Sequence, residues 1–341
     1  MLRLARLDAR TPGLSQRGEE PVEGTAVTGR WNSLLRILRA SLCPMDGMLS
    51  FNKDLSRVHL NASVAGPLFM LSAGLLFTML NVLIKLLGPD FRVWDIGFFR
   101  FFGSIVVLLI VFGRGRNLYR GHNVRLLIIR GCTGSAAFIS LVGAIRLLPV
   151  STALVIFYAF PAFSAVFSFM LYGESIGKLE ILCISLALVG VAVLFDFQLA
   201  GGVLGQAVSL TGAVFAGLTV TLIRTLRAHN GPVVIYLYFC TIGSLVTLPK
   251  FIQQPVLPST LTEAAMVLGI VLSSVSAQLL MNQGFFYCRG WEGGVFMSAE
   301  VVFTAIAGIA FLDDPATWRF WTGGLLVAAS VVALNRLKAK K

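Results

Sequence analysis

Long apolar runs separated by short polar loops fill the sequence from residue 65 to residue 334. Each run is continuously apolar and long enough to cross the roughly 30 Å hydrocarbon core of a bilayer as a helix, whereas a membrane barrel strand alternates over about ten residues. The pattern therefore predicts an all-α integral membrane protein. Ten transmembrane helices are expected, at residues 65–87, 95–112, 126–147, 150–172, 178–195, 204–226, 233–248, 265–287, 293–311 and 318–334.

The composition supports a membrane protein and changes how the charge is interpreted. The chain is 56% hydrophobic and 13% charged, whereas soluble domains hold about 25% charged residues. The formal charge of +12 would suggest nucleic acid in a soluble protein. Because cytoplasmic loops of membrane proteins collect Lys and Arg, we assign the charge to topology and expect no nucleic acid partner.

The basic residues gather on one side of the predicted bundle. The loop after residues 95–112 is rich in Arg. The loop after the span at 204–226 begins with Arg224 and Arg227, and residues 337–341 form a basic tail. With ten spans these segments lie on the same side as the N-terminal tail, so both termini are expected in the cytoplasm. The five Cys are odd in number and contain no CxxC pair, which argues against a disulfide framework.

Residues 1–64 differ from the remainder, because they mix basic and acidic residues without a long apolar run. We expect a cytoplasmic tail. Three interpretations stay open: a short basic amphipathic helix at residues 31–39 on the membrane surface, a disordered tail, or an untranslated stretch if the protein begins at Met45 or Met48.

The chain also contains an internal repeat. Residues 82–87 (VLIKLL) align with residues 221–226 (TLIRTL) at an offset of 139, and residues 163–166 (FSAV) align with residues 303–306 (FTAI) at an offset of 140. Two nearly equal offsets in separate helices indicate duplication rather than shared composition.

The repeat divides the membrane region into two five-helix halves, residues 65–196 and residues 204–336. An odd number of spans in each half means that the halves enter the membrane from opposite sides. Inverted repeats recur in secondary transporters, where the halves exchange conformations and open a midplane site to each side in turn.

Three local motifs add to this pattern: Gly173-Glu174 after the fourth span, Arg130-Gly131 in the third, and residues 146–149 (RLLP) before the fourth. Together with the ten spans, they resemble the EamA family of the drug/metabolite transporter superfamily. The resemblance implies two inverted EamA repeats around a central cavity. It further implies carriage of small organic metabolites across the bacterial inner membrane, often outward.

Arg100 and Glu300 are the strongest candidates for substrate binding. Arg100 lies about five residues inside its predicted span, where it either clamps a carboxylate or snorkels to the interface. Glu300 has little stem with which to reach water, so we favour binding of a substrate amine or a proton over interhelical hydrogen bonding. Counting residues from opposite faces leaves about 10 Å between the two along the membrane normal, which argues against a direct ion pair.

Antiparallel pairing of the eighth and ninth spans sets Asn282 near the depth of Glu300, with Gln278 one turn deeper. We therefore expect Gln278, Asn282 and Glu300 to form a polar patch. Asn81 and Tyr158 either line the cavity or serve helix packing.

Pro161 should loosen the fourth span by removing a backbone hydrogen bond. The sequence Asp313-Asp314-Pro315 resembles an acidic metal pair, but it fits better as a cap of the last helix. Other basic residues near span ends are expected to be interface anchors; these are Lys85, Arg130, Arg146 and Lys178.

These features favour a secondary transporter that exports small metabolites and needs no cofactor or metal. A nucleotide-sugar antiporter of the same superfamily is the alternative within transport. A membrane enzyme or scaffold is the alternative outside it, but the three His lie outside the spans and no HExxH, GxSxG or Walker sequence is present. The partners expected are a small-molecule metabolite and the lipid bilayer, with a homodimer left open.

Overall fold

A computed structural model of the chain describes residues 62–88, 90–113, 117–148, 150–194, 202–311 and 317–339. All of these belong to one compact unit. The expectations for the N-terminal tail and for the Asp313-Asp314-Pro315 sequence lie outside the described residues. Within the described ranges every regular element is an α-helix.

The helices follow the apolar runs, with ends that differ from the predicted ones by a few residues. They are α3 (Ala62–Leu86), α4 (Val93–Phe112), α5 (Val124–Leu147), α6 (Val150–Phe157), α7 (Phe160–Tyr172), α8 (Lys178–Leu194), α9 (Val203–Arg227), α10 (Pro232–Gln253), α11 (Leu261–Tyr287), α12 (Gly290–Met297), α13 (Ala299–Phe311) and α14 (Trp318–Ala339). In the described part, eight segments are long and apolar enough to cross a membrane, and two of them are interrupted crossings made of α6 with α7 and of α12 with α13. A shorter apolar stretch in α14 and the 17-residue α8 complete the expected ten.

Two crossings are broken near their middle. Helix α7 restarts at Phe160 with Pro161 in its first turn, where the missing N–H costs no helical hydrogen bond. This confirms the loosening expected at Pro161. Helix α13 restarts after Ser298, and this second break was not predicted because no proline marks it. Tyr158 and Ser298 are 140 residues apart, so both breaks fall at the same position of the repeat.

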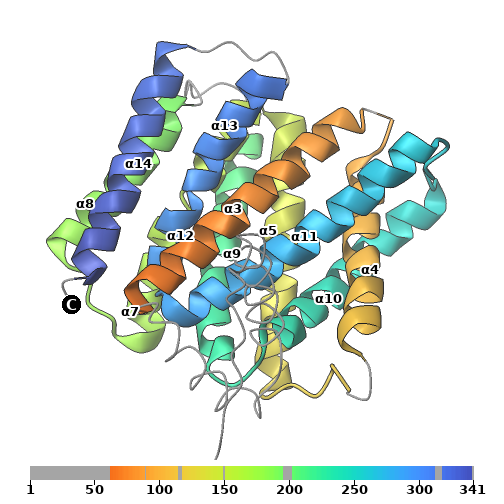
Figure 1. Ribbon diagram of the computed structural model, residues 1–341, viewed down its shortest axis with the longest axis horizontal. Coiled ribbons are helices and arrows are strands. Elements are labelled where there is room, and N and C mark those ends of the chain that lie inside the picture. Colours follow the sequence, from red (N-terminus) through yellow and green to blue (C-terminus); the bar gives the residue numbers. More distant parts are fainter. Residues whose placement is uncertain are drawn as a thin grey trace, which may run out of the picture. The chain divides into compact units, whose positions relative to one another are not determined.

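The helix pairings have two-fold character. Helix α3 packs against α11 as α9 packs against α5, and α13 packs against α3 as α7 packs against α9. The second helices of the two halves, α4 and α10, pair with each other, and so do the fifth helices, α8 and α14. Figure 1 shows the α8–α14 pair at one side and the α4–α10 pair at the other, with α3, α9 and α11 between them. This arrangement agrees with two inverted five-helix repeats.

Helices α8 and α14 cross so closely that their backbones meet. A Cβ built on Gly190 would lie 2.9 Å from the carbonyl oxygen of Gly323, and one built on Gly323 would lie 2.6 Å from that of Gly190. The Ser330 hydroxyl donates to the carbonyl oxygen of Cys183 at 2.8 Å in the same interface. Small residues and interhelical hydrogen bonds are the usual means of joining helices in lipid, where apolar burial offers little drive.

This crossing predicts that Gly190→Ala destabilises the protein. The added methyl meets backbone atoms that cannot move aside, and such overpacking costs about 1–3 kcal/mol. Gly143→Ala is the matched control, because its Cβ would have an ordinary 3.6 Å contact with Val208 while gaining helix propensity. Melting in detergent should therefore show a lower Tm for Gly190→Ala and an equal or higher Tm for Gly143→Ala. Equal Tm values for the two variants would contradict the close crossing.

Candidate functional site

Glu300 lies in the first turn of α13, directly after the second helix break, and α3 holds it there. The side-chain amide of Asn81 donates to Glu300 Oε1 at 3.2 Å, and the Thr78 hydroxyl donates to the Glu300 carbonyl oxygen at 3.4 Å. Gly74 lets α3 approach, since a Cβ there would already lie 3.5 Å from the Glu300 Cβ. Asn81 is exposed and Glu300 is half-buried, so the carboxylate is not sealed in protein.

Tyr158 occupies the other break. Its ring is half-buried, packs against Phe157 and Phe160, and lies beside the apolar cluster that contains Val301, the residue after Glu300. The structure thus brings three of the predicted site residues together: Asn81, Tyr158 and Glu300.

Arg100 belongs to a separate polar network on α4. Its Nε donates to the Ser274 hydroxyl at 2.8 Å, and the Tyr236 hydroxyl lies 3.0 Å from that of Ser274 and 2.9 Å from that of Ser104. The guanidinium also lies over the ring of Phe138, 5.6 Å from its centroid. Among the described residues no hydrogen-bond partner takes up its two terminal nitrogens.

Arg100 and Glu300 form no ion pair with each other in the described structure, as their estimated separation predicted. Each has a neutral hydrogen-bond partner instead, Ser274 for Arg100 and Asn81 for Glu300. A guanidinium and a carboxyl group are therefore both present in the middle of the bundle without forming an ion pair with each other.

The expected patch of Gln278, Asn282 and Glu300 is not assembled. Asn282 is fully buried, and its amide donates to the carbonyl oxygen of Pro232 at 3.4 Å rather than to Glu300. The ninth crossing begins at Gly290, three residues before the predicted 293, which places Glu300 ten residues, about 15 Å, from its start. Asn282 lies only five residues, about 7.5 Å, from the end of α11. Gln278 is also buried, and its Oε1 has no hydrogen-bond partner among the described residues.

Arg130 was expected to reach the membrane interface, and this was wrong. Its side chain is 1% exposed, and its guanidinium lies over the ring of Phe239, 4.3 Å from the centroid. Helix α5 packs against both α9 and α10, which enclose the position. An anchoring role needs a face turned to lipid, and the apolar pattern alone did not show which face that was.

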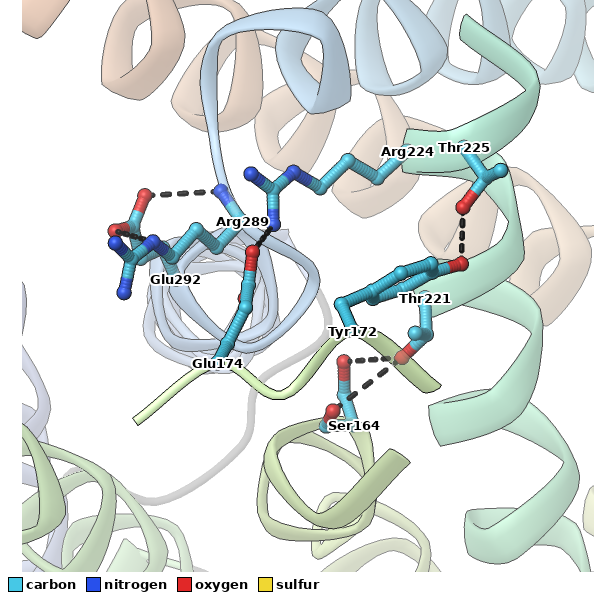
Figure 2. Close-up of polar contacts among 8 residues, drawn as sticks. All are labelled: Ser164, Tyr172, Glu174, Thr221, Arg224, Thr225, Arg289 and Glu292. Atoms are coloured by element: carbon cyan, nitrogen blue, oxygen red, sulfur yellow. Dashed lines mark hydrogen bonds and ion pairs between the residues drawn. The ribbon is translucent and has the colours of Figure 1, made fainter. Parts of the chain in front are cut away.

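One end of the bundle is held shut by polar contacts of α9 with α7 and the segment after it, and by the packing of α12 against α7 and α9; we refer to it as the closed end. Figure 2 shows Arg224 at the end of α9 paired with Glu174, just after α7. Deeper in the same interface the hydroxyls of Ser164 and Thr221 lie 2.9 Å apart. Arg289 pairs with Glu292 in the first turn of α12.

Arg227 fastens α9 to α11 at the closed end. It is 2% exposed, and its Nε donates to the carbonyl oxygen of Asn282 at 3.0 Å, while Nη2 donates to Gln283 Oε1 at 2.6 Å. Its Nη1 donates to the carbonyl oxygen of Asn230 at 2.5 Å. From the sequence we expected Arg224 and Arg227 only to mark the cytoplasmic side of the membrane. The signal available was Glu174, an acid at the end of another span on the same side.

The closed end breaks the two-fold character of the bundle. Helix α12 contacts α7 and α9, and α11 contacts α9. The equivalent pairs by the repeat are α6 with α13, α6 with α3, and α5 with α3, and none of these has a contact of similar extent among the described residues. The described conformation is therefore tightly packed at one end of the repeat-related interface and loosely packed at the other.

Comparisons with known proteins agree with this architecture. The chain is 26% identical over 276 residues to the pseudopaline exporter CntI of Pseudomonas aeruginosa. This alignment covers 80% of this chain and 97% of that protein. It is 25% identical over 258 residues to an S-adenosylmethionine uptake transporter of Rickettsia felis, covering 73% of this chain and 76% of the relative. The human solute carrier family 35 member G1 is 22% identical over 283 residues, 76% of this chain and 78% of that protein.

A crystal structure with 18% sequence identity shares the fold, with a TM-score of 0.70 over 81% of this chain and 98% of the other. The EamA-like transporter family matches the sequence twice, at residues 64–196 and at residues 203–336. These two matches cover most of the chain, and the resemblance inferred from the repeat is confirmed. The protein is a multi-pass membrane protein that belongs to the EamA-like transporter family.

Proposed function

We propose that this protein is a secondary transporter that exports small organic metabolites from a bacterial cytoplasm by alternating access. The observation that carries the proposal is an asymmetry in a two-fold bundle: among the described residues, three helix contacts at the closed end have no counterpart of similar extent at the other end. A carrier with inverted repeats alternates between two states in which the repeats exchange arrangements, and in each state one end of the bundle is closed.

The proposed orientation places the closed end, and with it both termini, at the cytoplasm. Arg224 and Arg227 lie at this end, as do Arg120 in the loop before α5 and Arg125 in the first turn of α5. Positively charged loops favour the cytoplasmic side. The described conformation is then outward-facing, with the cytoplasmic path blocked by the α7–α9–α12 contacts.

In this scheme the repeats at residues 65–196 and 204–336 exchange arrangements during transport. The pairs α4–α10 and α8–α14 each join equivalent helices and keep their partners through the exchange. The contacts of α12 with α7 and α9 are replaced by those of α6 with α13 and α3. The site at the two helix breaks stays near the middle of the membrane and changes only the side on which it opens.

The site supports recognition of a cargo with groups of both charges. Glu300, flanked by Asn81 and Tyr158, would hold an amine or a proton, and Arg100 would bind a carboxylate. Gln278 and Asn282, whose buried amide oxygens lack partners among the described residues, would help to complete the cavity in the other state. Export is favoured over uptake because the exporter relative aligns over 97% of its length.

Comparison of cells that lack and cells that overproduce the protein tests the transport function. Overproduction should enrich at least one small metabolite in the medium and deplete it from the cytosol, and deletion should reverse this. Mass spectrometry of medium and cytosol measures both. If no compound changes compartment, the export proposal fails; if the compound instead accumulates in the cytosol, the direction is wrong.

Glu300→Gln tests proton coupling, because the amide keeps the size of the side chain and removes its charge. Efflux from reconstituted vesicles by the wild-type protein should rise when the outside is more acidic than the inside. Glu300→Gln should lose this dependence, whereas Glu300→Asp should keep it at a lower rate, since it retains a carboxylate. A pH response of Glu300→Gln equal to that of the wild type would remove Glu300 from the coupling mechanism.

Arg224→Gln tests the closed end. The Arg224–Glu174 pair is partly exposed, so it contributes at most about 1 kcal/mol, which corresponds to an up to roughly fivefold larger open fraction when it is lost. The measurement is labelling of a single cysteine, Ser164→Cys, by an impermeant maleimide from the cytoplasmic side of inside-out vesicles, with the native cysteines replaced. Labelling should become about two- to fivefold faster with Arg224→Gln.

Glu263→Gln is the control for this experiment, because it neutralises a charged side chain at the first turn of α11, at the other end of the bundle. Gln can retain the capping interaction there, so the labelling rate of Ser164→Cys should stay unchanged. Faster labelling with Glu263→Gln than with Arg224→Gln would show that the closed end is held elsewhere.

A further inference from the structure

Arg130 is a buried cation that forms no ion pair with any residue that the structure describes. Its side chain is 1% exposed, and its Nε and Nη1 have no hydrogen-bond partner among the described residues. Moving a charged group out of water is costly unless it is paired and hydrogen-bonded. The contact with the Phe239 ring offsets only part of that cost. The buried Arg130 guanidinium therefore lowers the stability of the fold, and a function in transport would explain its presence.

In the part of the chain that the structure describes, no acidic side chain forms an ion pair with Arg130 or Arg100. The ion pairs of the described residues join Arg92 to Asp95, Arg224 to Glu174, and Arg289 to Glu292. Glu300, the acid at the middle of the bundle, has Asn81 as its hydrogen-bond partner. The region around α4, α5 and α10 therefore carries two guanidiniums and no carboxylate within ion-pair distance of either.

The two guanidiniums lie at the two ends of one aromatic pair. The rings of Phe101 and Phe239 meet edge to face with centroids 5.1 Å apart. Arg100 lies 5.8 Å from the centroid of Phe101, and Arg130 lies 4.3 Å from that of Phe239. The cations are thus neighbours across a thin apolar layer.

Arg100 and Arg130 also belong to opposite halves of the membrane. Arg130 is six residues, about 9 Å, from the start of α5 at the closed end. Arg100 is seven residues, about 10 Å, from the start of α4 at the other end. Arg100 is half-buried in the described conformation, whereas Arg130 is covered.

We propose that Arg130 and Arg100 form two successive subsites for an acidic group of the cargo, a carboxylate or a phosphate. Arg130 receives the oxyanion when the bundle opens to the cytoplasm, and Arg100 holds it when the bundle opens outward. A guanidinium suits this task because it stays charged and presents paired N–H donors that match the two oxygens of such a group. This inference rests on the proposed transport function and names the chemical class of its cargo.

The first test is the stability of the purified full-length protein. Arg130→Met replaces an unpaired buried charge with an apolar chain of similar length, so the Tm should rise by roughly 2–4 °C. Arg227→Met is the matched control, because it leaves Gln283 Oε1 and two carbonyl oxygens without their donor and should lower the Tm. A fall in Tm for Arg130→Met as large as that for Arg227→Met, or failure to fold, would show that Arg130 is a structural residue and overturn the proposal.

The second test is export by overproducing cells, read as the metabolites enriched in the medium. Compounds with an ionised carboxylate or phosphate should fall roughly ten- to hundredfold in Arg130→Met, the loss expected for hydrogen bonds to a charged group. Arg130→Lys keeps the charge but not the paired donors, so it should retain part of the export. The identity of the lost compounds distinguishes carboxylates from phosphates.

The outcomes separate this inference from the transport function. If the wild type enriches only neutral or cationic compounds, or if Arg130→Met exports acidic compounds as well as the wild type, transport stands and the anion subsites are wrong. If the wild type enriches nothing in the medium, transport itself fails, and the subsites fail with it.

Discussion

A polypeptide in lipid must satisfy its own backbone hydrogen bonds, and this constraint shapes every element described above. It accounts for the helical form of all described regular elements. It also restricts interruptions to places where neighbouring protein can cover the freed backbone groups. The two breaks, before Phe160 and at Ser298, lie where helices of both repeats meet. The need to cover the freed backbone groups therefore sets both the position of the breaks and the position of the polar residues beside them. Glu300 and Tyr158 are near each other because both repeats break at the same position.

The contacts at the closed end differ in strength, and the difference suits a carrier. The Arg224–Glu174 pair is partly exposed and therefore weak. Arg227 is buried, and three hydrogen bonds join its guanidinium to protein oxygens. Opening this end would have to keep Arg227 hydrated or paired, whereas Arg224 and Glu174 can separate at little cost. The pairs α4–α10 and α8–α14, by contrast, join equivalent helices of the two halves and would stay together when this end opens.

The sequence was sufficient for the features that depend on one-dimensional pattern. Hydropathy located the crossings, the offset of about 140 residues located the repeat, and Pro161 located the first break. The second break escaped notice because Ser298 has no distinctive chemistry. The start of the ninth crossing was placed three residues late because residues 288–292, which contain Arg289 and Glu292, were taken as a polar loop. Gly293 and Gly294 lie inside α12, where the absence of a Cβ lets Phe285 and Pro161 approach closely. The site was harder to predict, because Arg130 and Asn282 depend on the face that each helix turns inward.

The repeat makes each half of the chain a template for the state that the other half would adopt. Ser164 and Thr221, whose hydroxyls meet at the closed end, align with Thr304 and Val82. If the halves exchange arrangements, Val82 brings a methyl group where Thr221 brings a hydroxyl, so the opposite closure forms one hydrogen bond fewer. At about 1 kcal/mol, that difference would favour the present closure about fivefold. Unequal duplicates would thus give an empty carrier a preferred resting side without any additional domain.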